Sequence, residues 1–186
     1  MNKKIVGVLA IQGDFQAHRL MISRIGIETR EVRTAGDLAG VTHLIIPGGE
    51  STTIRKIAKA NGLWNKIAAF KGPVMGTCMG SILMAKHLDS LPEETLGMID
   101  MKIHRNAYGR QINSFSADGK VKFIDDPFEM IFIRAPKIMD VGKGVEPIAW
   151  LGDEITGVLA GNRVAITFHP ELSESAEVHR FFTELE

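Results

Sequence analysis

Gly-Thr-Cys-Met-Gly-Ser, residues 76–81, places the one cysteine of the chain between two glycines, directly after the short apolar run 74–77. The form Gly-x-Cys-x-Gly is typical of a nucleophile elbow, a tight strand-to-helix turn that pushes the central side chain out above a sheet. Each glycine is needed because a side chain there would crowd the neighbouring strand or helix. A lone cysteine is usually buried and inert, but this setting predicts an α/β fold that presents Cys78 as a nucleophile.

The residues after Cys78 strengthen this interpretation. A helix is expected to begin near Met79, with its clearly helical stretch at 81–87. The unpaired N–H groups at the start of a helix favour a thiolate, which is the attacking form of cysteine. The main-chain N–H of Met79 would point at the oxyanion that forms when Cys78 attacks a carbonyl carbon.

The rest of the first half repeats strand, loop and helix. The pattern predicts a mostly parallel sheet with helices on both faces. A second half of short β-like runs broken by Gly, Asp and Asn predicts additional antiparallel strands. Strands are expected at 3–11, 27–32, 42–46, 74–77 and 163–168, and antiparallel runs within 98–115 and 130–160. Helices are expected at 15–25, at 63–70 and at 174–185, and another helix is expected to start with Ser51, Thr52 or Thr53 near its cap.

Length and composition limit the class of protein. A chain of 186 residues fits one domain, expected to span residues 1–186. The 22 basic and 22 acidic residues are evenly spread, which argues against a nucleic acid or membrane partner. No apolar run approaches the roughly 20 residues that cross a bilayer, and no signal peptide precedes the first strand. With a single cysteine, the expected compartment is the cytoplasm.

A cysteine nucleophile needs a base, and His169 is the best candidate among the six histidines. It ends the last expected strand, and Glu171 follows two residues later. In an extended segment these two side chains point to the same side, about 6.6 Å apart, so Glu171 can orient the imidazole. Four other histidines are expected to be solvated or structural: His18 and His179 on helix surfaces, His87 near a helix end and His43 before a strand. His104 lies in a polar loop, and its role is left open.

Cys78 and His169 follow parallel strands, whose carboxyl ends share one edge of the sheet and form the usual ligand crevice of such folds. Gly48 and Gly49 follow another strand at that edge, and could bring a main-chain N–H close to the reacting carbonyl oxygen. The segment lacks the Gly-Lys-Ser/Thr ending of a phosphate-binding loop. No CxxC or HExxH spacing is present, so no metal is expected.

Taken together, these motifs resemble class I glutamine amidotransferase domains, and most closely the glutaminase subunits of pyridoxal 5'-phosphate synthase. The shared triad motifs are Pro-Gly-Gly-Glu-Ser-Thr at 47–52, Gly-Thr-Cys-x-Gly at 76–80 and Phe-His-Pro-Glu at 168–171. More particular to the subfamily are Val-Gly-Val-Leu-Ala-Ile-Gln-Gly at 6–13, the arginine motif at 105–115 and Phe-Ile-Arg-Ala-Pro at 132–136. The resemblance covers nearly the whole chain and implies a single flavodoxin-like domain.

The resemblance implies hydrolysis of L-glutamine to glutamate and ammonia through a γ-glutamyl thioester. Cys78 would attack the side-chain amide, His169 would carry the proton and Glu171 would orient the imidazole, while the N–H groups of Gly49 and Met79 would hold the oxyanion. The family's glutamine-binding positions correspond here to Gly49, Glu50, Ser51, Arg105, Ile133 and Arg134. In most family members the residue after the nucleophile is alanine, and Met79 departs from this.

The resemblance also implies a partner, a separate synthase subunit with a (β/α)8 barrel that combines ammonia with a pentose phosphate and a triose phosphate. Gln12, Gly13 and the following helix would belong to the docking face. Pyridoxal phosphate would be the product of the complex, and no cofactor is expected on this chain. Two alternatives remain: a cysteine hydrolase or deglycase that acts on another carbonyl, and a non-catalytic binding module with the same fold.

Overall fold

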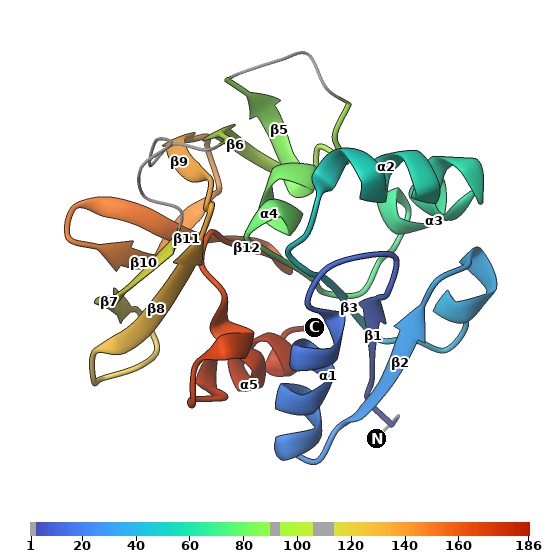
Figure 1. Ribbon diagram of the computed structural model, residues 1–186, viewed down its shortest axis with the longest axis horizontal. Coiled ribbons are helices and arrows are strands. Elements are labelled where there is room, and N and C mark those ends of the chain that lie inside the picture. Colours follow the sequence, from blue (N-terminus) through green and yellow to red (C-terminus); the bar gives the residue numbers. More distant parts are fainter. Residues whose placement is uncertain (1–2, 90–93, 106–113) are drawn as a thin grey trace.

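The computed structural model describes residues 3–89, 94–105 and 114–186. A nine-stranded sheet has the order β2-β1-β3-β4-β12-β11-β10-β7-β8, and a three-stranded sheet has the order β5-β6-β9 (Figure 1). The strands are β1 (Ile5–Leu9), β2 (Glu28–Val32), β3 (His43–Ile46), β4 (Val74–Thr77), β5 (Ala85–Leu88), β6 (Ile99–His104), β7 (Ser114–Val121), β8 (Phe128–Ile133), β9 (Lys137–Val141), β10 (Glu146–Leu151), β11 (Glu154–Ala160) and β12 (Arg163–Ile166). The helices are α1 (Phe15–Arg24), α2 (Ser51–Ala60), α3 (Leu63–Ala68), α4 (Met79–Met84) and α5 (Glu177–Glu184), with 3-10 turns η1 (Ala35–Leu38) and η2 (Pro170–Leu172).

The larger sheet is parallel at one end and antiparallel at the other. Strands β2, β1, β3, β4 and β12 pair in parallel, in the spatial order of a doubly wound fold. From β12 onward, β11, β10, β7 and β8 pair antiparallel. The predicted α/β class, with added antiparallel strands in the second half, is therefore confirmed.

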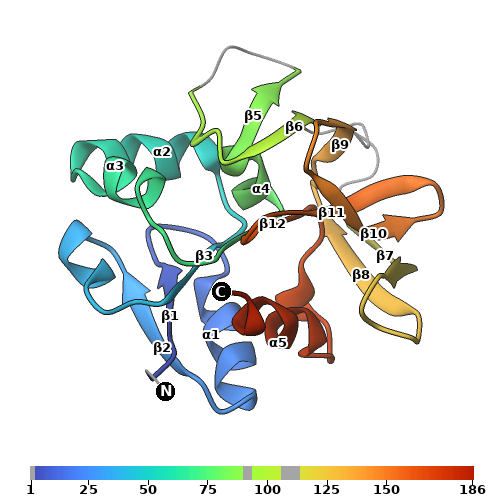
Figure 2. The ribbon, with the colours of Figure 1, turned by 180° about the vertical axis from the view of Figure 1, so that it is seen from behind.

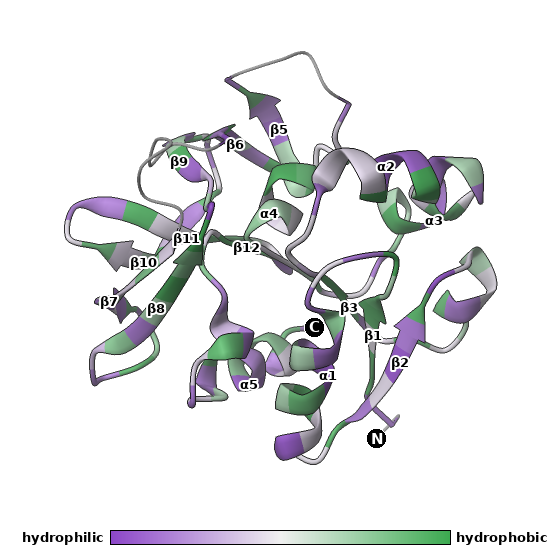
Figure 3. Cartoon of the chain, viewed as in Figure 1, coloured by the Kyte–Doolittle hydropathy of each residue, from purple (hydrophilic) through white to green (hydrophobic). Residues whose placement is uncertain are grey.

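Helices cover both faces of the parallel half, α2, α3 and α4 on one side and α1 and α5 on the other (Figures 1 and 2). The strands are apolar on both faces for this reason. Leu44 and Ile46 of β3 join the core cluster that includes Ile54 of α2. Ile45 between them joins the cluster that includes Ile22 of α1. In Figure 3, β1 and β12 are mostly green, whereas the edge strand β2 is largely purple.

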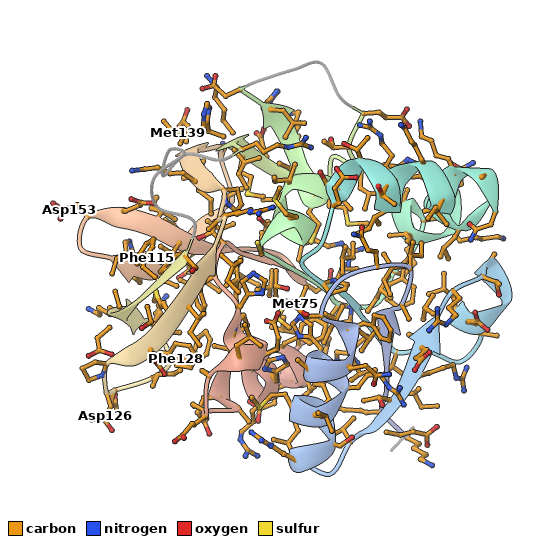
Figure 4. All side chains as sticks on the ribbon, viewed as in Figure 1. Met75, Phe115, Asp126, Phe128, Met139 and Asp153 are labelled. Carbon is orange, nitrogen blue, oxygen red and sulfur yellow. The ribbon has the colours of Figure 1, made fainter. Side chains whose placement is uncertain are left out.

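The antiparallel half has a core of aromatic side chains. Phe132 stacks on Phe115 with ring centroids 4.7 Å apart and meets Phe168 edge-on at 6.0 Å. Figure 4 labels Phe115 and Phe128 on this half and Met75 near the middle of the molecule. Phe132 and Phe168 are fully buried, so this core fixes the two segments that follow β8 and β12.

One local expectation is partly wrong. The helix expected to begin near Met79 does begin there, but it ends at Met84 rather than at residue 87, and the chain then enters β5. Every residue from Gly80 to Met84 is buried, whereas Lys86 and His87 are exposed and lie 3.2 and 3.4 Å from Oδ1 of Asp100. The chain leaves the helix because Ala85 and His87 pair with Ile99 and Lys102 of β6, so His87 lies in a strand.

The predicted helix start near Ser51 is confirmed, and its N-cap is Glu50. Its carboxylate accepts hydrogen bonds from the N–H groups of Thr52 (3.1 Å) and Thr53 (2.7 Å). A carboxylate is also the favourable charge at the positive end of a helix. None of the helices within the described ranges combines the length and apolarity that crossing a bilayer requires.

Candidate active site

Three neighbouring strands end side by side at the carboxyl edge of the sheet. Ile46 of β3 pairs with Gly76 of β4, and Thr77 of β4 pairs with Ile166 of β12. The main-chain N–H of Cys78 donates to the carbonyl oxygen of Ile166 at 2.8 Å. The loops that follow these strands therefore meet at one place, as the sequence predicted.

Cys78 occupies a strained turn between β4 and α4. Its φ is +48° and its ψ is −116°, a conformation that L-residues rarely adopt. A Cβ on Gly80 would lie 2.0 Å from the carbonyl oxygen of Ile46, and one on Gly76 would lie 2.6 Å from the sulfur of Met84. The predicted steric need for both glycines is confirmed. Because α4 has only six residues, its dipole adds less to the field at the sulfur than a long helix would.

His169 and Glu171 form a buried hydrogen-bonded pair. Nδ1 of His169 lies 2.7 Å from Oε1 of Glu171, and the two residues are 3 % and 5 % exposed. The expected extended geometry is wrong, because residues 170–172 form the 3-10 turn η2 and His169 is its N-cap. The turn brings the carboxylate back to the ring, and the main-chain N–H of His169 donates to the carbonyl oxygen of Ile131 in β8 at 2.8 Å.

The imidazole and the thiol meet against Gly48. A Cβ on Gly48 would lie 2.7 Å from Cε1 of His169 and 3.3 Å from Cβ of Cys78, so the two side chains approach through space that only glycine leaves open. Nε2 of His169 is buried and makes no hydrogen bond within the described residues. Burial lowers the pKa of His169, but the interactions with Cys78 and Glu171 outweigh burial and raise this pKa to about 10.

The thiol is covered, and the expectation that the elbow leaves it open above the sheet is wrong for this conformation. Cys78 is 2 % exposed, and its S–H donates to the carbonyl oxygen of Ile133 at 3.5 Å. Ile133 ends β8, and Arg134 after it has a φ of +47°. A segment distant in sequence thus closes over the sulfur, and a substrate must displace it.

Four of the expected glutamine-binding positions, Gly49, Glu50, Ser51 and Arg105, lie at or against the start of α2, whereas Ile133 and Arg134 lie at the thiol. Arg105 donates from Nη2 to Oγ of Ser51 at 2.6 Å. The N–H of Glu50 donates to Oε1 of Gln12 at 3.1 Å, while its carboxylate caps the helix. The hydrogen bond from the Thr53 hydroxyl, together with those from the Thr52 and Thr53 N–H groups, outweighs burial and lowers the pKa of Glu50 to about 2. Residues 106–113 of the arginine motif lie outside the described residues.

The loop that precedes α1 lies directly on the Gly48–Gly49 turn. Gly49 has a φ of +152°, and a Cβ on Gly13 would lie 1.6 Å from the carbonyl oxygen of Gly48. Gln12 and Gly13, which the sequence assigns to a docking face, therefore contact the loop expected to supply an oxyanion N–H. Met79, the other expected donor, begins α4 and packs partly buried against the core.

Two histidines expected on helix surfaces are instead fully buried behind the pair. Nδ1 of His18 lies 2.9 Å from Nε2 of His179, and Nε2 of His18 lies 3.0 Å from Oγ1 of Thr77 and 3.4 Å from Oε2 of Glu171. The sequence does indicate this placement. His18 follows Phe15 by three residues, so both lie on the apolar face of α1, as is usual for a buried position.

Asp14, His169 and Glu171 offer three potential ligand atoms within 4.8 Å of one another. Nδ1 of His169 and Oε1 of Glu171 are already bonded to each other, so this cluster is the pair described above with one exposed carboxylate beside it. Among the remaining histidines, His43 is buried with Nε2 3.1 Å from the carbonyl oxygen of Leu185, and His104 lies 3.3 Å from Oδ2 of Asp89.

The doubly wound sheet with this cysteine elbow and histidine–glutamate pair defines the class as that of the glutamine amidotransferases. The model of the SNO glutamine amidotransferase family matches residues 8–185, and the chain belongs to this family. A solved structure described as a glutamine amidotransferase is 43 % identical, with a TM-score of 0.91 over 96 % of this chain and 97 % of the other.

Curated relatives match nearly the full length of the chain. Pyridoxal 5'-phosphate synthase subunit PdxT of Thermosipho africanus is 43 % identical over 180 residues, covering 95 % of this chain and 96 % of the relative. A protein of the same description from Thermus thermophilus is 45 % identical over 186 residues, 97 % of each chain. A solved structure of PurLQS from Thermotoga maritima is 17 % identical, with a TM-score of 0.67 over 92 % of this chain and 89 % of the other, which indicates a common fold.

Proposed function

We propose that this chain is a glutaminase that hydrolyses L-glutamine to L-glutamate and ammonia, and that it supplies the ammonia to a separate synthase subunit that makes pyridoxal 5'-phosphate. The observation that carries the proposal is the convergence of Cys78, His169 and Glu171 at the carboxyl edge of the sheet. Membership of a glutamine amidotransferase family supports the reaction, and the relatives named as pyridoxal 5'-phosphate synthase subunits support the destination of the ammonia.

The reaction proceeds in two steps. Once the Ile133 carbonyl group is displaced, the thiol of Cys78 gives its proton to Nε2 of His169. The resulting thiolate attacks the side-chain amide carbon of glutamine, and the oxyanion accepts hydrogen bonds from the N–H groups of Gly49 and Met79. The His169 imidazolium gives its proton to the leaving nitrogen, so ammonia departs and a γ-glutamyl thioester remains. Water then attacks the thioester while His169 takes its proton, and glutamate leaves as the thiolate re-forms. Glu171 holds the ring through Nδ1, which leaves Nε2 to face the sulfur.

The substrate enters by displacing the carbonyl group of Ile133 from the thiol. The bond that must break is a weak S–H donor contact at 3.5 Å, so the barrier from this contact alone is small. Arg105 is held beside Ser51 and is suited to the α-carboxylate of glutamine, with Arg134 next to the displaced carbonyl. Gly49, Glu50, Ser51, Arg105, Ile133 and Arg134 together form the proposed glutamine site.

The proposed partner is a (β/α)8-barrel synthase subunit, docked on Gln12, Gly13 and α1. One contact supports docking on this face. The Gln12 side chain accepts a hydrogen bond from the N–H of Glu50, which is next to Gly49, the proposed oxyanion donor. Residues 1–186 act as one glutaminase domain, with the cytoplasm as the proposed compartment.

The test measures ammonia released from glutamine by the chain alone, by the synthase subunit alone and by the two together. We expect release in the mixture, and none when Cys78→Ala replaces the wild type. A mixture that forms a complex but releases no ammonia contradicts the proposal. Turnover of another carbonyl substrate by the chain alone would favour the hydrolase or deglycase alternative, and a thiol that resists glutamine-analogue electrophiles within the complex would favour the binding module.

A further inference from the structure

His18 connects the two ends of the proposed triad from behind. Its Nε2 lies 3.0 Å from the hydroxyl oxygen of Thr77, the residue directly before Cys78, and 3.4 Å from Oε2 of Glu171. Its other nitrogen lies 2.9 Å from Nε2 of His179. The side chains of His18 and Glu171 are 0 % exposed, and His179 is equally buried. The glutaminase reaction described above uses neither histidine.

The contacts select one tautomer of His18. Oε2 of Glu171 makes no hydrogen bond within the described residues, and a lone pair on Nε2 of His18 at 3.4 Å would repel it. A proton on Nε2 instead gives a donor to the Thr77 hydroxyl and a positive dipole beside the carboxylate. Nδ1 of His18 then accepts from the Nε2–H of His179. This choice leaves the buried Nδ1 of His179 as an unpaired acceptor, which costs less than an unpaired buried N–H.

The electrostatics agree with a neutral donor. Burial lowers the pKa of His18, and the charge of His169 lowers it further. The negative charges of Glu171 and Asp14 raise this pKa, but by less, so it is lowered overall. Burial also lowers the pKa of His179, to about 3. Burial raises the pKa of Glu171, whereas a positive charge on His18 and the hydrogen bond and charge of His169 lower it, and the pKa is lowered overall. With His18 neutral, its N–H dipole and the bond to His169 favour the ionised carboxylate. Glu171 is therefore an ionised buried carboxylate between two imidazoles, and such a charge needs compensation on both oxygens.

We propose that His18 is a positioning residue of the glutaminase, whose Nε2–H donates to the Thr77 hydroxyl and lies beside the second oxygen of Glu171, with His179 setting its tautomer. Glu171 is then held by the hydrogen bond with His169 on Oε1 and by electrostatic attraction to the N–H of His18 on Oε2. The same imidazole ties the acid to the strand that carries the nucleophile, so the distance between the base and the sulfur is set partly by His18. This inference rests on the proposed function.

The first test compares His18→Leu with His18→Gln in the complex with the synthase subunit. Leucine removes the donor, whereas the glutamine amide can place an N–H near the former Nε2 position. His43→Leu is the matched control, because His43 is also buried but bonds to the carbonyl group of Leu185, outside the triad. We expect His18→Leu to lower kcat about 10- to 100-fold, the usual effect of losing the partner of a functional side chain, with KM for glutamine within about twofold.

His18→Gln is expected to recover part of the loss, and His43→Leu to stay within about twofold of wild type in kcat. The upper limb of the pH profile should move to lower pH in His18→Leu, because a loosened Glu171 supports the His169 imidazolium less well. A merely structural role would not move this limb. A folded His18→Leu enzyme with kcat within twofold of wild type overturns the proposal, as does an equal loss in His43→Leu.

The second test needs no substitution, and so decides the matter even if His18→Leu does not fold. Imidazole ¹⁵N shifts of the wild-type chain should show His18 neutral between pH 6 and 8, with the proton on Nε2. A charged ring or a proton on Nδ1 overturns the proposal. The protonation state of His18 is measured without any turnover of glutamine, so it tests this inference alone. If the wild-type chain releases no ammonia with the synthase subunit, that failure counts against the proposed function instead.

Discussion

The sulfur of Cys78 lies 3.5 Å from the carbonyl oxygen of Ile133, and the residue after Ile133 is Arg134. Cys78 and Arg134 are the non-glycine residues with positive φ among those the structure describes. Strained backbone persists where surrounding structure holds it, and here the two strained residues flank one contact. Backbone strain is therefore found at the nucleophile, Cys78, and at Arg134 in the segment that covers it.

The strain at Cys78 predicts a difference between two inactive variants. Both Cys78→Ala and Cys78→Gly should abolish glutaminase activity. A φ of +48° destabilises the folded state of a non-glycine residue by about 1–3 kcal/mol. Glycine avoids this strain but loses about 0.5–1 kcal/mol on folding, because its unfolded backbone has more freedom to lose. We expect Cys78→Gly to exceed Cys78→Ala in free energy of unfolding by about 1 kcal/mol, measured by urea denaturation. An alanine variant at least as stable as the glycine variant contradicts this.

The raised pKa of His169 predicts how stability depends on pH. A folded-state pKa of about 10, above the ordinary value of 6.5, means that the protonated ring stabilises the folded chain. The contribution is complete below pH 6.5 and is lost as the pH rises through about 10. The difference in urea midpoint between wild type and His169→Asn should shrink over this range. A difference that stays constant from pH 6.5 to 10 would show that the ring is neutral in the folded state.

The close approach at Gly48 predicts that a single methyl group stops the reaction. A Cβ there would lie 2.7 Å from Cε1 of His169 and must push the ring from the sulfur. Gly48→Ala should lower kcat at least about 100-fold, since a displacement of about 1 Å in a reacting group costs that much. Gly36→Ala is the control, because the nearest atom to its Cβ is 3.8 Å away. Unchanged kcat in Gly48→Ala would mean that the base and the nucleophile do not meet there.

Arg105 is expected to act mainly in binding. Its guanidinium is fixed by the hydroxyl of Ser51, and a charge-assisted hydrogen bond to a carboxylate is worth about 1.5–3 kcal/mol. Arg105→Gln should therefore raise KM for glutamine roughly 10- to 100-fold with a smaller change in kcat. The exposed Arg180→Gln, on α5 and away from the proposed glutamine site, serves as the control. A fall in kcat at unchanged KM would place Arg105 in the chemical step instead.

The elbow and the places along the chain where the parallel strands fall could be predicted because their causes are local. Gly76 and Gly80 are required by atoms a few residues away or in the adjacent strand, and the apolar runs indicate strands covered on both faces. The pairing of His169 with Glu171 was also predictable from their spacing. Its geometry was not, because a 3-10 turn and an extended strand both bring positions two apart within reach.

The remaining features depend on contacts between distant segments. The cover over Cys78 comes from Ile133, 55 residues away, and the burial of His18 depends on α5, which carries His179. A polar side chain on an apolar helix face gives only a weak indication until the partner segment is known. The end of α4 at Met84 depends likewise on β6, with which the residues after it pair.

The most direct test of the account is the mass of the chain after reaction with an electrophilic glutamine analogue in the presence of the synthase subunit. The account predicts a single γ-glutamyl-type adduct on Cys78, absent in Cys78→Ala and blocked by excess glutamine. A complex that hydrolyses glutamine while the adduct forms on another residue, or does not form at all, would contradict the assignment of Cys78 as the nucleophile.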